Sequence, residues 1–217
     1  MRFSDSPAVE LPVGGAVLSF QQDNGSMHVG TSVWPCSLVL VKFVERCLLG
    51  PAASPYADLL RFQGKRAVEL GSGCGPAGLG LLLLGLNVIL TDIAPVMPAL
   101  RHNLRRNRRN LPRTPRYAQL YWNNPEQIRA LRPPFDFIIA ADVVYMEDSV
   151  GPLVSAMEAL VSAAGAVLLG YQVRSPEAHA LFWELCERSF TVHKVPREHL
   201  HPEYAYEEAD VFILKKK

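Results

Sequence analysis

A glycine-rich stretch follows a short apolar run in the first half of the chain. Residues 68–78 read Val-Glu-Leu-Gly-Ser-Gly-Cys-Gly-Pro-Ala-Gly, so a strand is predicted to enter a turn that contains Gly71 and Gly73. Glycine permits a tight turn and lets the backbone come close to a ligand. Asp92 ends the next apolar run, 21 residues after Gly71. A carboxylate there can accept hydrogen bonds from both hydroxyls of a ribose, so the pattern predicts a nucleotide-type cofactor.

The residues that accompany the glycines narrow the type of cofactor. A phosphate-binding loop needs a Gly-Lys-Ser/Thr sequence, which the chain lacks. The Gly-x-Gly-x-x-Gly fingerprint of dinucleotide sites fits only when it is shifted to begin at Gly73. Glu69, two residues before Gly71, would repel a pyrophosphate but suits a ligand that carries an ammonium and a sulfonium. These charges describe S-adenosylmethionine, which we therefore expect as the cofactor.

The elements that must position this loop alternate between strands and helices from Ala67 onward. Several apolar runs are nearly continuous, as in strands that are buried on both faces. The predicted strands are 67–70, 87–92, 117–121, 135–142, 165–173, 190–195 and 209–215. The predicted helices are 77–84, 95–109, 149–163 and 175–188, with Gly165 as the stop after the third. This alternation predicts an α/β fold with a doubly wound sheet of seven strands.

The N-terminal part has a different pattern. Residues 17–20 and 27–29 flank Asp-Asn-Gly-Ser at 23–26, which is typical of a β-hairpin. Residues 34–49 then predict an amphipathic helix. We expect an N-terminal hairpin and lid helix over residues 1–50, followed by the cofactor-binding domain over residues 51–217.

Composition excludes several classes of protein. The chain has 217 residues, 49% of them hydrophobic, which is enough to form a full core. Its formal net charge of +1 does not predict a nucleic-acid binder. The four cysteines lack CxxC spacing, so we expect neither a zinc site nor a disulfide framework. His199 and His201 have no third ligand nearby, so no metal is assigned.

The expected compartment is the cytoplasm, with the nucleus left open. The N-terminus begins Met-Arg-Phe-Ser-Asp and shows no signal peptide. The most apolar stretch, residues 79–90, is too short to span a membrane and contains two glycines and an asparagine. We therefore expect a soluble protein that has no membrane partner.

Four segments carry a resemblance to a known family. Residues 69–75 with Asp92 resemble the first motif of seven-strand S-adenosylmethionine methyltransferases, a class I methyltransferase fold. The segment around Trp34, Leu120-Tyr121-Trp122 and Asp142-Val143-Val144-Tyr145 resemble the protein-lysine methyltransferase branch. Residues 201–216 are similar to the valosin-containing-protein type within that branch. The sequence departs from the branch at Pro35, where aspartate is usual, and at Asn123, where glycine is usual.

The resemblance implies a role for each matching position. On the cofactor side, Trp34 covers the methionine end, the backbone of Gly71, Ser72 and Gly73 approaches the ligand, Asp92 holds the ribose, Trp122 stacks on adenine, and Ala141 lies beside the cofactor. On the acceptor side, Asp142 attracts and orients a lysine, and the ring of Tyr145 forms a wall of its channel. The implied function is transfer of a methyl group to a lysine of a folded protein, plausibly a chaperone or AAA-type ATPase, with S-adenosylhomocysteine as product.

Other functions stay open from the sequence alone. A nucleic-acid amino-methyltransferase usually has Asp/Asn-Pro-Pro-aromatic at this strand end, and residues 142–145 lack the prolines. A small-molecule methyltransferase and a cofactor-binding partner protein without turnover are further alternatives. Residues 101–116 hold seven arginines, and no acid occurs from residue 93 to 125. This basic run is typical of a solvated helix face, but it could also contact phosphates or an acidic protein.

Overall fold

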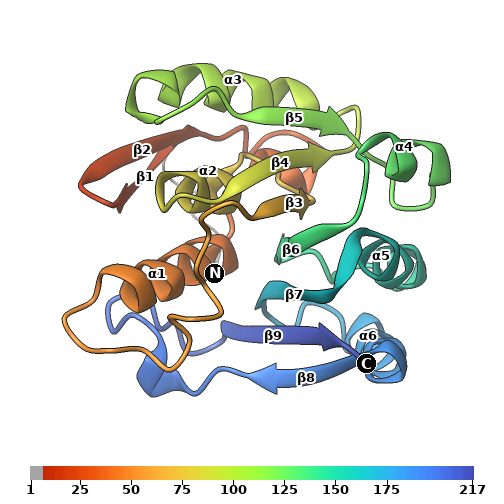
Figure 1. Cartoon of the computed structure of the whole chain (residues 1–217). Helices are drawn as coiled ribbons and strands as arrows, with labels where there is room; N and C mark the ends of the chain where they lie inside the picture. Colours follow the sequence, from red (N-terminus) through yellow and green to blue (C-terminus); the bar gives the residue numbers. More distant parts are fainter. Residues whose placement is uncertain (1–6) are drawn as a thin grey trace.

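A seven-stranded sheet forms the centre of the computed structural model, which describes residues 7–217. The strand order is β5-β4-β3-β6-β7-β9-β8, with β5 at the top and β8 at the bottom of Figure 1. The strands are β3 (Arg66–Leu70), β4 (Asn87–Asp92), β5 (Arg116–Gln119), β6 (Phe135–Ala141), β7 (Val161–Tyr171), β8 (Phe190–Lys194) and β9 (Asp210–Lys216). The strands from β3 to β7 pair in parallel, and β9 runs antiparallel to both of its neighbours. The predicted α/β fold class is confirmed.

Helices cover both faces of this sheet. They are α1 (Pro35–Leu49), α2 (Pro76–Leu83), α3 (Met97–Asn107), α4 (Pro125–Ala130), α5 (Glu147–Leu160) and α6 (Pro176–Ser189). Alternate residues of a strand point to opposite faces. In β6, Phe137 and Ile139 therefore pack with α1, α2 and α3, whereas Ile138 and Ala140 pack with α5 and α6. Two cores on one sheet explain why the central strands are continuous apolar runs.

The N-terminal hairpin exists, but its position was predicted wrongly. Strands β1 (Ala8–Val13) and β2 (Ala16–Gln21) pair around a turn at Gly14 and Gly15. Both glycines have positive φ angles, which suits a tight hairpin turn. Residues 17–20 are indeed in a strand, but 27–29 are not its partner. The Asp-Asn-Gly-Ser signal at 23–26 instead lies in the connection to α1.

Two asparagines attach this hairpin to α3. The side chain of Asn103 accepts from the backbone N–H of Gln21 and donates to its carbonyl, at 2.8 and 3.1 Å. One helical turn later, Asn107 makes the same pair of bonds with Ser19, at 2.8 and 2.9 Å. The two amides thus act as a further strand along the free edge of β2.

Helix α1 is not amphipathic as predicted, because it is surrounded. Residues 35–44 are all buried, and α1 contacts α2, β7, β9 and the hairpin. Lys42 is buried among them and donates to the carbonyl of Pro12 and to Glu45, at 2.5 and 2.6 Å. Glu45 in turn accepts from the backbone N–H of Gly14 at 2.7 Å. Lys42 and Glu45 therefore bind the hairpin.

Two other predictions along the chain are corrected. The helix predicted over 149–163 ends at Leu160, and β7 begins at Val161, so Gly165, predicted as a helix stop and the first residue of a strand, lies inside that strand. A Cβ on Gly165 would lie 2.9 Å from the carbonyl oxygen of Asp136, beside an irregular register between β6 and β7. Glycine thus marks a close strand contact here. Helix α4 was not predicted; its cap, Asn124, accepts from the backbone N–H groups of Glu126 and Gln127.

The state of the cysteines and the lengths of the helices bear on the predictions made from composition. All four cysteines are buried and free. Within residues 7–217, no helix is long and apolar enough to cross a membrane.

We predict that Asn103→Ala and Asn107→Ala each destabilise the protein by about 1–3 kcal/mol, because each removes two part-buried hydrogen bonds to the backbone of β2. Asn110→Ala is the matched control, since Asn110 is exposed and makes one bond, to the carbonyl of Val17. Urea unfolding followed by circular dichroism measures all three free energies of unfolding. Equal losses for all three variants would show that the two asparagines do not hold the hairpin.

Candidate functional site

A cavity of about 540 Å³ opens at the C-terminal ends of β3, β4 and β6. This is the edge at which parallel α/β sheets bind their ligands. The cavity is lined by all ten residues to which the sequence assigned a role: Trp34, Glu69, Gly71, Ser72, Gly73, Asp92, Trp122, Ala141, Asp142 and Tyr145. The structure thus brings them together, while their individual roles stay predictions.

The loop after β3 comes so close to its neighbours that it requires glycine. Gly71 and Gly73 have φ angles of +68° and +54°. A Cβ on Gly71 would lie 2.9 Å from Cγ1 of Val143, and one on Gly73 would lie 2.9 Å from the carbonyl oxygen of Gly30. A larger residue at either position would therefore push the loop away from Val143 or Gly30.

Asp92 joins this loop to the end of β4. Its carboxylate accepts from the backbone N–H of Gly73 at 2.7 Å and from that of Ile93 at 2.8 Å. Burial raises the pKa of Asp92 above its usual value, although both hydrogen bonds oppose the change. A carboxylate has about four lone-pair sites, so Asp92 keeps acceptor capacity toward the cavity.

Glu69 is the most deeply buried acid of the site. One oxygen, Oε1, accepts from the backbone N–H of Gly78 at 3.2 Å, in the first turn of α2. The other, Oε2, has no hydrogen-bond partner within residues 7–217. Burial raises the pKa of Glu69 to about 7. Oε2 is itself buried and lies against Gly78 of α2 rather than on the cavity surface. Such an unpaired carboxylate oxygen is costly, and a proton or a nearby cationic group lowers that cost.

Asp142 is held by a residue that the sequence analysis did not identify. Arg174 donates to Oδ1 from Nε at 2.8 Å and to Oδ2 at 2.5 Å, a bidentate pair. The guanidinium also stacks over the ring of Trp34, 4.8 Å from its centre. Asp142 has a φ angle of +60°, a costly conformation for a residue with a Cβ. Arg174 thus fixes Asp142 and Trp34 relative to each other.

Close backbone packing supports the same arrangement. A Cβ on Gly170 of β7 would lie 2.5 Å from the carbonyl oxygen of Cys36, so the start of α1 rests directly on β7. Trp34 caps α1 and donates from its ring N–H to the carbonyl of Val29 at 2.9 Å. The lid predicted around Trp34 is therefore anchored from two sides.

Cys74 is in the loop but is not suited to be a nucleophile. Burial, followed by the charge of Asp92, raises its pKa to about 12, so it stays a thiol. Its Sγ lies 3.6 and 3.7 Å from the carbonyl oxygens of Gln21 and Gly30. The side chain therefore fills space between the loop and the N-terminal segment.

Arg174, which holds Asp142, and several cavity residues carried no usable signal in the sequence. Arg174 is 32 residues from Asp142, and no local pattern predicts that pair. Asp148 lines the cavity from the first turn of α5, which the sequence placed two residues too late. Met27 and Val29 line it from the connection that was predicted as part of the hairpin.

The electrostatics of the cavity favour a cationic ligand. Four carboxylates line it, from Glu69, Asp92, Asp142 and Asp148, and within residues 7–217 no lysine or arginine does. The orphaned oxygen of Glu69 and the closeness of the glycine loop both fit a ligand that carries an ammonium and lies against backbone. S-adenosylmethionine has this chemistry, so the residues present fit the expected cofactor.

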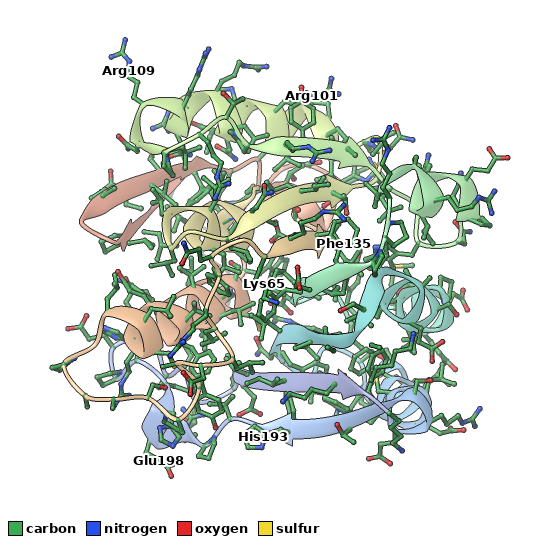
Figure 2. All side chains as sticks on the ribbon, in the orientation of Figure 1. Lys65, Arg101, Arg109, Phe135, His193 and Glu198 are labelled. Carbon is green, nitrogen blue, oxygen red and sulfur yellow. The ribbon has the colours of Figure 1, made fainter. Side chains whose placement is uncertain are left out.

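The basic run at 101–116 is exposed along one side of the molecule. All seven arginines are exposed, on α3, on the following turn and at the start of β5. Figure 2 shows Arg101 and Arg109 pointing away from the body of the protein. None of the seven lines the cavity.

We predict that Glu69 makes stability fall as pH rises. In the folded protein the pKa of Glu69 is about 7, above its ordinary value, so at pH values between the two the folded state binds more protons than the unfolded state. The free energy of unfolding therefore falls as pH rises toward and through 7. The ligand-free protein should lose on the order of 2–3 kcal/mol from this group between pH 5 and 8. Urea unfolding at several pH values should show that Glu69→Gln removes this loss.

Glu203→Gln is the control for this measurement, because Glu203 is exposed and forms no salt bridge with any residue from 7 to 217. It should leave the pH dependence unchanged. If Glu69→Gln also leaves the dependence unchanged, the carboxyl of Glu69 has an ordinary pKa and our description of its burial is wrong.

Comparison with known proteins agrees with this geometry. The lysine methyltransferase family matches residues 14–189. Protein N-lysine methyltransferase METTL21A of Mus musculus is 30% identical over 214 residues, which cover 96% of this chain and 87% of the relative. METTL21A of Danio rerio is 30% identical over 87% of this chain and 81% of its own length. EEF1A lysine methyltransferase 3 of Xenopus tropicalis is 27% identical over 78% of this chain and 70% of its own.

Solved structures share the fold. A 16S rRNA N2 methyltransferase (RsmC) of T. thermophilus, in complex with AdoMet and guanosine, superposes with a TM-score of 0.62. The match covers 97% of this chain and 50% of that one at 21% identity. At this identity the likeness shows the class I methyltransferase fold alone. The family match, together with the relatives at 30% identity, establishes more: the chain belongs to the lysine methyltransferase family, and the protein is an S-adenosylmethionine-dependent protein-lysine N-methyltransferase.

Proposed function

We propose that the acceptor is a lysine on the surface of a folded protein, with chaperones and AAA-type ATPases as the expected class. The observation that carries this proposal is the charge of the cavity: four carboxylates line it, of which only Asp142 is paired with an arginine, and no lysine or arginine lines it among the described residues. An ammonium is attracted to such a cavity, whereas the phosphates of a nucleic acid are repelled. The end of β6 also lacks the prolines usual in nucleic-acid amino-methyltransferases.

On the cofactor side, each residue that lines the cavity is proposed to contact one part of S-adenosylmethionine. The cofactor supplies an electrophilic methyl group on a sulfonium. Glu69, which lines the cavity, stabilises the ammonium of the methionine part through its charge, and Asp92 accepts from the ribose hydroxyls. Gly71 and Gly73 permit close backbone approach, Ser72 lies between them, Trp122 stacks on the adenine, and Ala141 lies beside the ligand.

On the acceptor side, the residues must align a lysine and favour its neutral form. Its ordinary pKa is about 10.4, so it arrives as an ammonium. Asp142 accepts from it with the lone pairs that Arg174 leaves available, and Trp34 and Tyr145 form the walls. Removal from water disfavours the charged amine, whereas the carboxylate of Asp142 favours it, so desolvation must outweigh this attraction for the amine to lose its proton to water. Positioning of the two reactants alone can lower a barrier by about 7–11 kcal/mol.

The expected class of acceptor rests on resemblance. Residues 201–216 are similar to the valosin-containing-protein type, which favours a AAA-type ATPase. One relative is named for EEF1A, so a translation factor is the second candidate. The four buried, free cysteines fit a reducing compartment, which supports the proposal that the reaction takes place in the cytoplasm or nucleus.

An extract assay tests the proposal. The protein is incubated with cell extract and cofactor labelled in its methyl group, and labelled bands are digested and analysed by mass spectrometry. We predict methyl groups on lysine side chains of folded proteins, unchanged by prior RNase and DNase treatment. Label that disappears with nuclease, or that appears only on small metabolites, would overturn the proposed acceptor.

Asp142→Asn is the control that ties the label to this cavity. It preserves the shape of the side chain but removes the charge that orients the lysine, so label should fall by about tenfold or more. Binding of S-adenosylhomocysteine, measured by calorimetry, should change much less. A wild-type rate of labelling by the folded variant would remove Asp142 from the acceptor site.

A further inference from the structure

Exposed apolar side chains gather at the mouth of the cavity. Within residues 7–217, nine large apolar side chains are exposed: Val17, Met27, Val29, Leu49, Tyr117, Tyr145, Met146, Val173 and Val192. Four of the nine, Met27, Val29, Tyr145 and Met146, also line the cavity, and we call these four the apolar collar. Met27 is 97% exposed and Met146 is 53% exposed. Exposed apolar groups that cluster in this way mark a binding surface.

The collar comes from two segments that are distant in the sequence. Met27 and Val29 precede α1, and Tyr145 and Met146 precede α5. Because all four are exposed and line one cavity, the two segments both lie where this cavity meets the solvent. The collar is therefore continuous with the site of methyl transfer.

Hydrogen bonds hold the first segment in place. The carbonyl of Val29 accepts from the ring N–H of Trp34, and the hydroxyl of Thr31 donates to the carbonyls of Asp23 and His28. The backbone N–H of Val33 donates to the side chain of Gln22 at 2.7 Å. Met27 is thus presented to solvent from a well-bonded loop rather than from a free chain.

The second segment is held in a similar way. The carbonyl of Met146 accepts from both the backbone N–H and the hydroxyl of Ser149, at 3.1 and 2.7 Å. This cap starts α5 and fixes the backbone at Met146, while the side chain stays exposed. Preorganised segments of this kind bind a partner with a smaller loss of conformational entropy.

Charge at the mouth agrees with an incoming lysine. Asp148 lines the cavity next to the collar, and Glu147 precedes it in the first turn of α5. Neither acid forms a salt bridge with any residue from 7 to 217. The mouth therefore combines apolar contacts with free negative charge, which suits a cation surrounded by apolar groups.

We propose that the apolar collar binds the residues around the acceptor lysine, so that this protein selects lysines that lie beside large apolar side chains. This inference rests on the proposed function, because it assumes that a protein lysine enters the cavity. Burial of apolar surface stabilises the complex, and the flexible thioethers of Met27 and Met146 adapt to side chains of different shape. An acceptor lysine surrounded by acidic or polar side chains would bury little apolar surface against the collar and would bind less tightly.

The double variant Met27→Gln/Met146→Gln tests the collar, since glutamine keeps the length of methionine but is polar. The matched control is Leu49→Gln/Val192→Thr, which alters two exposed apolar residues outside the cavity. Initial rates of lysine labelling are measured in the extract assay at dilutions where rate is proportional to extract, so that they report kcat/KM. Calorimetry with S-adenosylhomocysteine gives cofactor affinity for each protein.

We expect the collar variant to label its acceptor lysines at least about tenfold more slowly, with cofactor affinity changed less than threefold. The control pair should keep the wild-type rate. Labelled peptides should carry Leu, Ile, Val, Met or Phe within two positions of the modified lysine, or beside it on the folded surface, more often than other lysines of the same proteins.

The outcomes separate this inference from the proposed function. If the wild-type protein labels lysines but the collar variant labels them equally fast, the collar does not bind the acceptor. An equal loss in the control pair, or labelled lysines without apolar neighbours, overturns the inference in the same way. If the wild-type protein labels no protein lysine, the proposed function fails, and the collar inference fails with it.

Discussion

Carboxylates that are removed from water without a cation nearby cost free energy, and this protein places two of them at the ends of adjacent strands. Glu69 and Asp92 are both buried, and burial raises the pKa of each. Backbone N–H groups satisfy Asp92, but one oxygen of Glu69 is left without a partner among the described residues. The cavity is therefore incomplete until a ligand brings positive charge to it.

The remaining structure keeps that cavity shaped and close to backbone. Glycine at 71 and 73 lets the β3–α2 loop pack against Val143 and Gly30. Arg174 joins Asp142 to the ring of Trp34 and so links the end of β6 to the start of α1. Farther away, the asparagine bonds from α3 fix β2, from which the collar segment leads to α1. The parts of the chain that touch the ligand are thus supported by contacts outside the cavity.

Local patterns in the sequence predicted the features that depend on neighbours along the chain. The glycine spacing, the acid at Asp92 and the apolar strands all follow from short-range rules, and β4 was predicted with the observed boundaries. Features that depend on distant partners were missed. Arg174 comes close to Asp142 only when β6 and β7 pair, so the sequence alone does not reveal this contact. The hairpin turn was predicted at 23–26, but it forms at Gly14 and Gly15, where β1 pairs with β2. Gly165 was predicted as a helix stop because its close contact with the backbone of β6 depends on strand pairing, which the sequence alone does not show.

The measurement that tests this account most directly is the proton balance of cofactor binding. Calorimetric titration of S-adenosylhomocysteine at pH 7, in buffers with different ionisation enthalpies, gives the number of protons exchanged. Glu69, with a pKa of about 7, is about half protonated in the free protein, and an ammonium beside it favours the carboxylate. The account predicts release of about half a proton per cofactor bound, and that Glu69→Gln abolishes the release. Binding with no proton exchange, or with proton uptake, would contradict it.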